Sequence, residues 1–410
     1  MDSREYIPRK ALTTVREMTR SFPCVMITGA RQVGKSTMLR QIMPDDMKYV
    51  TLDDFRKLKR AKEDPIGFLE ELGTPLCIDE VQYAPELLRA IKLIVDEKDQ
   101  AGMYWLTGSQ RFHMMKDAAE SLAGRVGLVE LTSLSQQEAN HESELPDFFP
   151  TIERMRQLTP DRRSCDINEL YARIWRGGYP ALHRDLNRNL NHYFDSYLQT
   201  YLERDVQALT QVGDKNAFLT LMQSAAARTG QQLVYADIAK DAGISPKTAR
   251  NWLSILEASG IITILPPYSV NTLKRLSKTP KLYFMDTGFC AWLGSWNTPA
   301  ALQNGALSGA ILETWVFGQL YRALGNRGMR SRLSYYRDSN GAEVDFILEY
   351  ENKLFPMEVK RNSNPSASDM KALHGLPLGK SELQPGIVLC PTREMMSIGG
   401  GHYAFPISAM

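Results

Sequence analysis

Short β-prone runs alternate with longer amphipathic stretches through the first 131 residues of the chain. The runs occupy residues 24–28, 48–53, 75–78, 103–107 and 126–131. Between them apolar residues recur at helical spacing, as at Leu87, Ile91 and Ile94 after Pro85. Strands that alternate with helices predict an α/β fold, in which helices cover both faces of a parallel sheet.

The pattern changes after residue 131. Residues 132–165 are polar and contain several prolines, which is typical of a linker or an exposed insertion. Helical patterning returns at 167–176, breaks at the Gly-Gly-Tyr-Pro sequence of 177–180, and continues over about 191–211. The first 135 residues therefore form one predicted domain, and residues 136–212 form a linker and helical segment.

A helix-turn-helix pattern follows. It consists of a short helix over 233–242, a glycine turn, a second helix over 246–259 and a strand over 261–265. Ser245 can cap the second helix, and Pro246 suits its first position. This order predicts a winged helix-turn-helix module over residues 213–290.

Residues 29–36 read Gly-Ala-Arg-Gln-Val-Gly-Lys-Ser and match the phosphate-loop pattern. A predicted strand precedes them and a helix-compatible run follows, so backbone N–H groups and a helix N-terminus would surround an anion. A chance glycine turn is the weaker interpretation. Lys35 is predicted to bind the β- and γ-phosphates of ATP, and Ser36 to bind Mg²⁺. The predicted cofactor contacts are Gly29, Ala30, Arg31, Gln32, Val33, Gly34, Lys35, Ser36 and Thr37.

Polar residues end the later runs of the same predicted sheet. Asp79 is expected to hold the Mg²⁺ through water, and Glu80 to act as the general base for the attacking water. Ser109 and Gln110 are candidates for contact with the γ-phosphate. Arg125 is a candidate arginine finger, acting in cis or from a neighbouring subunit, although a surface arginine in a turn is an equal alternative.

Composition narrows the class of protein. The chain has 410 residues, of which 43% are hydrophobic and 23% charged, as in a globular protein. Its five cysteines are far apart, which argues against a disulfide framework or a zinc site. The charged N-terminus and the lack of a long apolar run predict a cytoplasmic protein with no membrane partner.

The net charge of +2 gives no indication of a partner, but the charge is uneven along the chain. Residues 214–281 hold nine basic and four acidic side chains, which favours contact with DNA over a purely protein-binding module. The predicted DNA contacts on the second helix and the wing are Lys247, Thr248, Arg250, Asn251, Lys274 and Arg275.

Acids and a lysine alternate along two predicted strands near the C-terminus. In an antiparallel hairpin, Asp345 and Glu358 can converge on one Mg²⁺ or Mn²⁺ ion, while Lys360 polarises a water. Glu313, on a predicted helix, could complete the metal site. A solvent-facing hairpin with ordinary charge alternation is the alternative. A run of arginines lies nearby and is expected to grip a phosphate backbone: Arg322, Arg327, Arg330, Arg332 and Arg337.

Several of these stretches together resemble one family, the AAA-like ATPases with a C-terminal DUF4143 domain. The resemblance is carried by residues 28–37, 78–82, 106–109, 121–125, 177–180 and 282–288. The pattern Asp345…Glu358-Val359-Lys360 resembles the PD-(D/E)XK nuclease motif. The resemblance implies a RecA-like ATPase sheet, a winged helix and, over residues 291–410, a restriction-endonuclease-like domain.

Two functions follow from these patterns. The first is an ATP-hydrolysing protein that acts on DNA, with metal-dependent cleavage as a further capacity. The second is a nucleotide-controlled signalling or assembly switch, whose nuclease-like domain binds without cleaving. Since AAA-type ATPases usually need a neighbour's arginine, a homo-oligomer is expected in either case.

Overall fold

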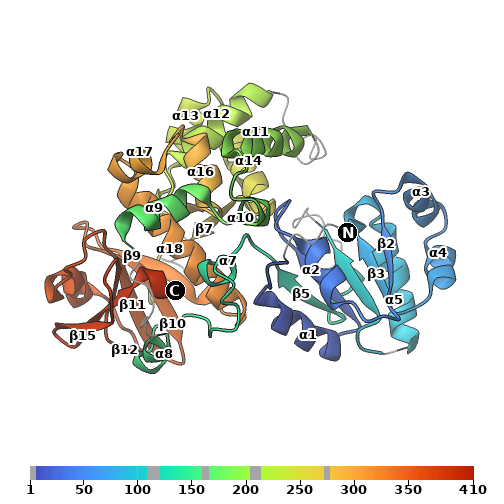
Figure 1. Cartoon of the computed structure of the whole chain (residues 1–410), viewed down its shortest axis with the longest axis horizontal. Helices are drawn as coiled ribbons and strands as arrows, with labels where there is room; N and C mark the ends of the chain where they lie inside the picture. Colours follow the sequence, from blue (N-terminus) through green and yellow to red (C-terminus); the bar gives the residue numbers. More distant parts are fainter. Residues whose placement is uncertain (1–5, 99, 109–120, 159–165, 204–213, 272–277) are drawn as a thin grey trace. The chain divides into compact units, whose positions relative to one another are not determined.

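The computed structural model describes residues 6–98, 100–108, 121–158, 166–203, 214–271 and 278–410 (Figure 1). The chain divides into two compact units. The first comprises Met1–Leu134 with two later segments, Tyr179–Arg184 and Ala258–Ile261. The second comprises Ser135–Gly178, Asp185–Glu257 and Ile262–Met410.

A five-stranded parallel sheet forms the centre of the first unit. Its strands are β1 (Cys24–Thr28), β2 (Lys48–Thr51), β3 (Leu76–Asp79), β4 (Tyr104–Thr107) and β5 (Val126–Glu130). They lie in the order β2-β3-β4-β1-β5, and every neighbouring pair is parallel. This confirms the α/β fold with a P-loop ATPase sheet that the sequence predicted.

Helices connect these strands and supply the rest of the core. They are α1 (Ala11–Ser21), α2 (Lys35–Ile42), α3 (Phe55–Glu63), α4 (Pro65–Leu72) and α5 (Glu86–Lys98). Leu87 and Ile91 of α5 are fully buried in one cluster with Leu76, Ile78 and Leu106 of the strands. The helical spacing of the apolar residues therefore directs one face of α5 into the sheet.

The helical part of the second unit begins with short elements and continues with longer ones. The helices are α7 (Gln136–Ala139), α8 (Ile152–Gln157), α9 (Ile167–Arg176), α11 (Leu190–Tyr201), α12 (Lys215–Ala226), α13 (Tyr235–Asp241), α14 (Pro246–Ala258), α16 (Thr287–Leu293) and α17 (Pro299–Asn304). The short helix α10 (Pro180–Arg184) belongs to the first unit. The predicted helices over 167–176, 233–242 and 246–259 are confirmed to within two residues at each end.

A small antiparallel sheet accompanies α12, α13 and α14. Its strands are β6 (Gln231–Gln232), β7 (Ile262–Leu265) and β8 (Lys281–Phe284), in the order β6-β8-β7. Along the chain the elements run helix, strand, helix, helix, strand, strand. This is the helical module that the sequence predicted, and it is the arrangement on which a winged-helix assignment rests.

The C-terminal part is a larger mixed sheet packed on a long helix. The helix α18 (Ser308–Gly325) is buried over most of its length. The strands are β9 (Leu333–Arg337), β10 (Glu343–Tyr350), β11 (Lys353–Val359), β12 (Glu382–Leu383), β13 (Ile387–Cys390), β14 (Met396–Gly399) and β15 (His402–Pro406). They are ordered β14-β15-β13-β11-β10-β9, with β12 beside β11. The antiparallel β10–β11 hairpin agrees with the sequence prediction.

The expectation of a linker or an exposed insertion at residues 132–165 is only partly met by the residues that the structure describes, since His141 and Glu144 are exposed. Phe148 and Phe149 are buried, and their rings pack against Phe405 and Phe355 of the C-terminal sheet at centroid distances of 5.3 and 5.7 Å. The segment is polar on average, so its composition did not indicate that Phe148 and Phe149 would be buried. Across the described parts of both units, no helix is long and apolar enough to span a bilayer.

Candidate functional site

The phosphate loop joins β1 to α2 through unusual backbone angles. Gly29 has φ of 140° and Gly34 has φ of 93°, and α2 begins at the next residue, Lys35. A Cβ atom on Gly29 would lie 1.9 Å from the carbonyl oxygen of Leu131, so only glycine fits there. Gln32, between the two glycines, also has a positive φ, of 61°. Residues of alternating backbone hand turn their N–H groups toward one point, which is the geometry of an anion-binding loop.

The side chain of Lys35 folds back over this loop. Its Nζ donates to the carbonyl oxygens of Gly29 and Ala30 at 3.0 and 2.9 Å, and the residue is only 6% exposed. An ammonium held inside the loop is placed to bind phosphate oxygens. The loop residues predicted to contact ATP are thus gathered at one end of β1, with Gln32 and Thr37 exposed and Arg31 and Ser36 half-buried.

Asp79, the last residue of β3, lies next to Ser36 of α2, although β4 lies between β3 and the strand β1 that leads into the phosphate loop. The Ser36 hydroxyl donates to Asp79 Oδ1 at 2.9 Å. The Thr107 hydroxyl also donates to Oδ1, and the Tyr49 hydroxyl donates to Oδ2 at 2.5 Å. The hydroxyl and the carboxylate that were predicted to hold Mg²⁺ are therefore adjacent, and the residues present fit a Mg²⁺ ion of a bound nucleotide.

Glu80 follows Asp79 in the left-handed backbone region, with φ of 59°. Its backbone N–H donates to the Thr107 hydroxyl at 3.2 Å, and its carboxylate accepts a hydrogen bond from the Gln82 side-chain amide. A positive φ in a residue other than glycine or asparagine is uncommon and often accompanies a functional constraint. Glu80 thus lies at the same end of the sheet as the phosphate loop, as predicted.

Sequence reasoning missed three residues of this site. Arg9 is buried, and its guanidinium donates to the carbonyl oxygens of Val33 and Thr132, both at 2.7 Å. Arg9 therefore joins the phosphate loop to the segment that follows β5. Thr107 and Tyr49 were missed as partners of Asp79, although both occupy predicted strands. The position of Thr107 at the end of β4 was the available signal.

Arg125 cannot serve as an arginine finger in cis. It precedes β5, and its carbonyl oxygen accepts from the N–H of Cys24, the first residue of β1. The phosphate loop follows the last residue of β1. Arg125 and the phosphate loop therefore lie at opposite ends of the parallel strands, about 16 Å apart along the strand direction. The guanidinium instead pairs with Asp96. A role in a neighbouring subunit stays a prediction.

Four predicted contacts lie outside the residues that the structure describes. They are Ser109, Gln110, Lys274 and Arg275. The predicted DNA contacts on α14 are described: Lys247, Arg250 and Asn251 are exposed, and Thr248 is half-buried. The Ser245 hydroxyl caps α14 by accepting from the Thr248 N–H at 3.1 Å. This end of α14 presents two cations and an amide on one exposed stretch.

The structure divides the predicted arginine cluster between packed and exposed side chains. Arg322 is buried and donates to the carbonyl oxygen of Met285 at 3.1 Å. Arg327 stacks on Phe149, and Arg330 stacks on Tyr321. Of the five, Arg327, Arg332 and Arg337 are exposed, and Arg337 pairs with Glu343 at 2.9 Å. Arginines that are close in sequence therefore have different environments, and three of them make contacts within the fold.

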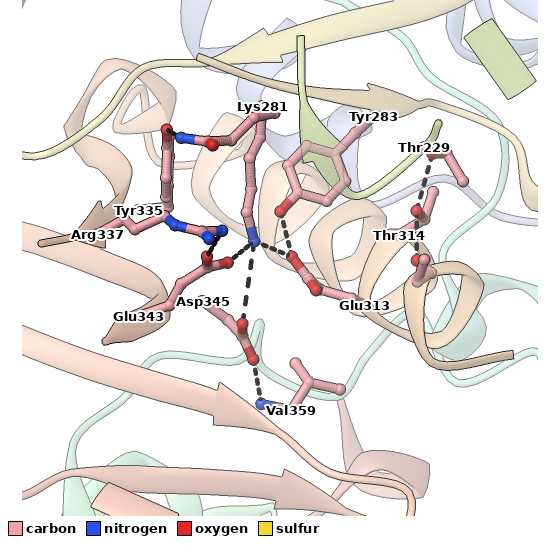
Figure 2. A network of polar contacts seen from close by, with 12 residues as sticks. Thr229, Lys281, Tyr283, Glu313, Thr314, Tyr335, Arg337, Glu343, Asp345 and Val359 are labelled. Atoms are coloured by element: carbon pink, nitrogen blue, oxygen red, sulfur yellow. Dashed lines mark hydrogen bonds and ion pairs between the residues drawn. The ribbon is translucent and has the colours of Figure 1, made fainter. Parts of the chain in front are cut away.

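The C-terminal acids do converge, but on a lysine (Figure 2). Lys281 Nζ lies 2.7 Å from Glu313 Oε1, in direct contact with Glu343 Oε1, and 4.0 Å from Asp345 Oδ1. The Tyr283 hydroxyl donates to the same oxygen of Glu313 at 2.5 Å. Burial opposes the charge on Lys281, but the carboxylates outweigh it and raise the pKa of Lys281 above its usual value.

Glu358 on β11 and Lys360, which directly follows that strand, complete the group. Lys360 Nζ donates to Glu358 Oε2 at 3.1 Å, and Asp345 Oδ2 accepts from the N–H of Val359 at 2.8 Å. Burial and the carboxylate of Asp345 raise the pKa of Glu358 to about 9. The same two causes raise the pKa of Glu313 to about 7.

These residues do not fit a divalent metal in the arrangement they have. No group of three acidic, histidine or cysteine side chains that could hold a metal is found among the described residues. Lys281 lies among the carboxylates that the sequence assigned to Mg²⁺ or Mn²⁺. Its role was missed because Lys281 follows a predicted wing and precedes the acids by 32 residues or more.

Three family models match successive parts of the chain. Residues 21–140 match AAA_14, described as an AAA domain. Residues 167–300 match DUF8612 and residues 308–410 match DUF4143, each described as a domain of unknown function. These matches confirm the AAA domain and the C-terminal DUF4143 domain that the sequence motifs indicated.

Two relatives align over most of the chain. Uncharacterized protein Rv2008c of Mycobacterium tuberculosis and Uncharacterized protein Mb2031c of Mycobacterium bovis are each 29% identical over 364 residues. Each alignment covers 88% of this chain and 75% of the relative. Their names assign no activity.

Solved structures are more distant. A Signal Transduction ATPase with Numerous Domains protein with a tetratricopeptide repeat sensor, PH0952 from Pyrococcus horikoshii, is 14% identical, with a TM-score of 0.26. That alignment covers 79% of this chain and 48% of the other, so this chain spans about half of its length. Protein VC1899 from Vibrio cholerae is 11% identical, with 94% of both chains covered and a TM-score of 0.19. TM-scores this low support no inference.

Proposed function

Because the chain carries an AAA domain followed by a DUF4143 domain, we propose that it binds and hydrolyses ATP and couples this turnover to DNA. The observation that carries the proposal is the pairing of Ser36 with Asp79 beside a phosphate loop that holds the ammonium of Lys35. Phosphate binding, cation binding and a candidate general base lie at one edge of the sheet. All three are needed for phosphoryl transfer to water.

Each residue has a distinct task in this proposal. Lys35 and the loop N–H groups would bind the β- and γ-phosphates, and Ser36 and Asp79 would hold the Mg²⁺ ion. Bound Mg²⁺ would neutralise negative charge on the phosphates during the reaction. Glu80 orients the attacking water and accepts its proton. Tyr49 and Thr107 are positioning residues, because both donate to the carboxylate of Asp79.

The exposed end of α14 supports the DNA part of the proposal. Lys247 and Arg250 are exposed there beside Asn251, whereas Trp252, Leu253 and Leu256 are buried on the opposite face. A helix with an apolar inner face and a basic outer end can bind phosphates and enter a major groove. The winged helix therefore supplies the DNA contact, and a homo-oligomer would supply the missing arginine finger.

The Mg²⁺-dependent rate of ATP hydrolysis tests this function. It would be measured alone and with single-stranded, duplex and branched DNA. We expect one DNA form to raise the rate. We expect Lys35→Ala to lower the rate about 10²-fold or more, because it removes a charge that stabilises the transition state. Lys62→Ala, an exposed lysine on α3, is the matched control and should keep the full rate.

The second candidate function is a nucleotide-controlled switch. The occupation of the acidic group by Lys281 favours it, because a non-cleaving C-terminal domain would serve as a binding platform. A rate that is low and indifferent to every DNA form would support the switch. Full turnover by Lys35→Ala would contradict both functions, since both depend on this nucleotide site.

A further inference from the structure

The ammonium of Lys281 occupies the centre of the acidic group in the C-terminal domain. Its contacts are Glu313 on α18 and Glu343 and Asp345 on β10 (Figure 2). An ammonium ion and a divalent cation both seek carboxylate oxygens, and they repel each other at short distance. A metal bound to these oxygens would have to displace Lys281.

The backbone and the surrounding side chains fix this lysine. Lys281 is paired with Gln232 of β6 on one side and with Leu265 of β7 on the other, so β8 cannot shift without breaking two ladders. Its side chain is 3% exposed and passes 5.3 Å from the ring centre of Tyr335. The ammonium is therefore held away from solvent in this packing.

The charges of the group are nearly balanced without a metal. Four carboxyl groups are present, from Glu313, Glu343, Asp345 and Glu358, and three cations contact them, from Lys281, Arg337 and Lys360. The second oxygen of Asp345 is also taken, by the N–H of Val359. Buried carboxylates that are paired and hydrogen-bonded in this way have little to gain from an additional ion.

We propose that Lys281 takes the place of a divalent cation, so that the acidic group of this chain is a metal-independent structural centre that does not cleave phosphodiesters. Lys281 holds α18 and β10 to the β6-β8-β7 sheet through its carboxylate contacts. The proposal does not depend on ATP turnover, since all of these residues lie in the second unit.

Binding of Mn²⁺ to the full, nucleotide-free chain tests the proposal, with electron paramagnetic resonance to separate free from bound ion. An Asp79→Asn background removes a contribution from the nucleotide site. We expect no bound Mn²⁺ at millimolar concentration with Lys281 present. Lys281→Met should gain one site, and adding Asp345→Asn should remove it again. Lys281→Arg, which keeps the cation, should bind no ion.

Two results would overturn the proposal. One is Mn²⁺ binding by the parent protein that Asp345→Asn abolishes. The other is a folded Lys281→Met protein that gains no site, with folding checked by circular dichroism. If Lys281→Met does not fold, the parent protein still decides the matter, because it needs no change at Lys281. Mn²⁺-dependent nicking of plasmid DNA by the parent, abolished in Asp345→Asn, would likewise contradict a non-cleaving centre.

Discussion

The guanidinium of Arg9 donates one hydrogen bond to Val33 in the phosphate loop and another to Thr132 after β5. Both acceptors are backbone carbonyl oxygens, so the interaction depends on the shape of the loop and not on its side chains. Arg9 belongs to no recognised sequence motif, but at the scale of single residues it helps to fix the conformation of the phosphate loop. A buried carbonyl that loses its donor is left without a hydrogen bond, which costs free energy.

Arg9→Ala is therefore expected to weaken nucleotide binding and to destabilise the protein by about 1–3 kcal/mol, since it removes a charged donor to one buried and one half-buried carbonyl. Arg9→Lys can donate to one of the two carbonyls, so its nucleotide affinity and its stability should lie between those of the parent protein and Arg9→Ala. The dissociation constant of a fluorescent ATP analogue and the free energy of unfolding provide the measurements. Arg16→Ala, at an exposed position of α1, is the control. An unchanged dissociation constant in Arg9→Ala would remove Arg9 from the nucleotide site.

Gly29 and Gly124 allow a matched comparison, because both have positive φ but different surroundings. A Cβ atom on Gly29 would collide with the carbonyl of Leu131, whereas one on Gly124 would have no neighbour within 4 Å. We expect Gly29→Ala to abolish nucleotide binding and Gly124→Ala to cost only about 1–2 kcal/mol of backbone strain. Binding and thermal unfolding would be measured for both. Equal effects would mean that the steric collision at Gly29 is unimportant.

At the scale of elements, α14 combines a fixed inner face with an exposed basic end. The Trp252 ring packs on Phe218 of α12 with centroids 5.3 Å apart, which anchors the helix independently of Lys247 and Arg250. Substitutions at the exposed end should therefore change binding without unfolding the module. This separation makes α14 a suitable element for testing DNA binding.

Lys247→Ala and Arg250→Ala should each lower the salt dependence of DNA binding. For duplex DNA the slope of log affinity against log salt should fall by about 0.9 for each phosphate group that the variant no longer neutralises. Fluorescence anisotropy over a range of NaCl concentrations gives this slope. Lys380→Ala, an exposed lysine of the C-terminal part, should leave it unchanged. If neither substitution on α14 alters the slope, the helix does not bind the DNA backbone.

The sequence predicted the elements and the local motif better than it predicted long-range partners. The phosphate loop was predictable because its function depends on eight consecutive residues between a strand and a helix. The partners of Lys281 were not, since they join β8 to α18 and β10 across the fold. Arg125 shows the same limit, because spacing along the chain does not say at which edge of a sheet a residue lies.

At the scale of the whole molecule, the chain consists of two compact units with separate cores, and the nucleotide site lies in the first. A ligand that binds one folded unit stabilises that unit, by about 2.7 kcal/mol at a hundred times its dissociation constant. We expect calorimetry to show two thermal transitions. ATP with Mg²⁺ should raise the midpoint temperature of one of them. Phe317→Leu, which disrupts the stacking of Phe317 on Tyr283, should lower the midpoint temperature of the other transition. A single transition that both changes shift equally would show that the units unfold together.

The position of Lys281 also has a consequence for how such genes can recombine. Lys281 lies before residue 300, whereas the acids that it contacts, Glu313, Glu343 and Asp345, lie after it. A fusion that joined the last hundred residues to a foreign upstream sequence would inherit buried carboxylates without their cation. Leaving a buried charge unpaired costs about 3–5 kcal/mol, a large part of the stability of a domain. Selection should therefore keep these two stretches of the gene together, and a natural hybrid that separates them is expected to carry a replacement cation at the position of Lys281.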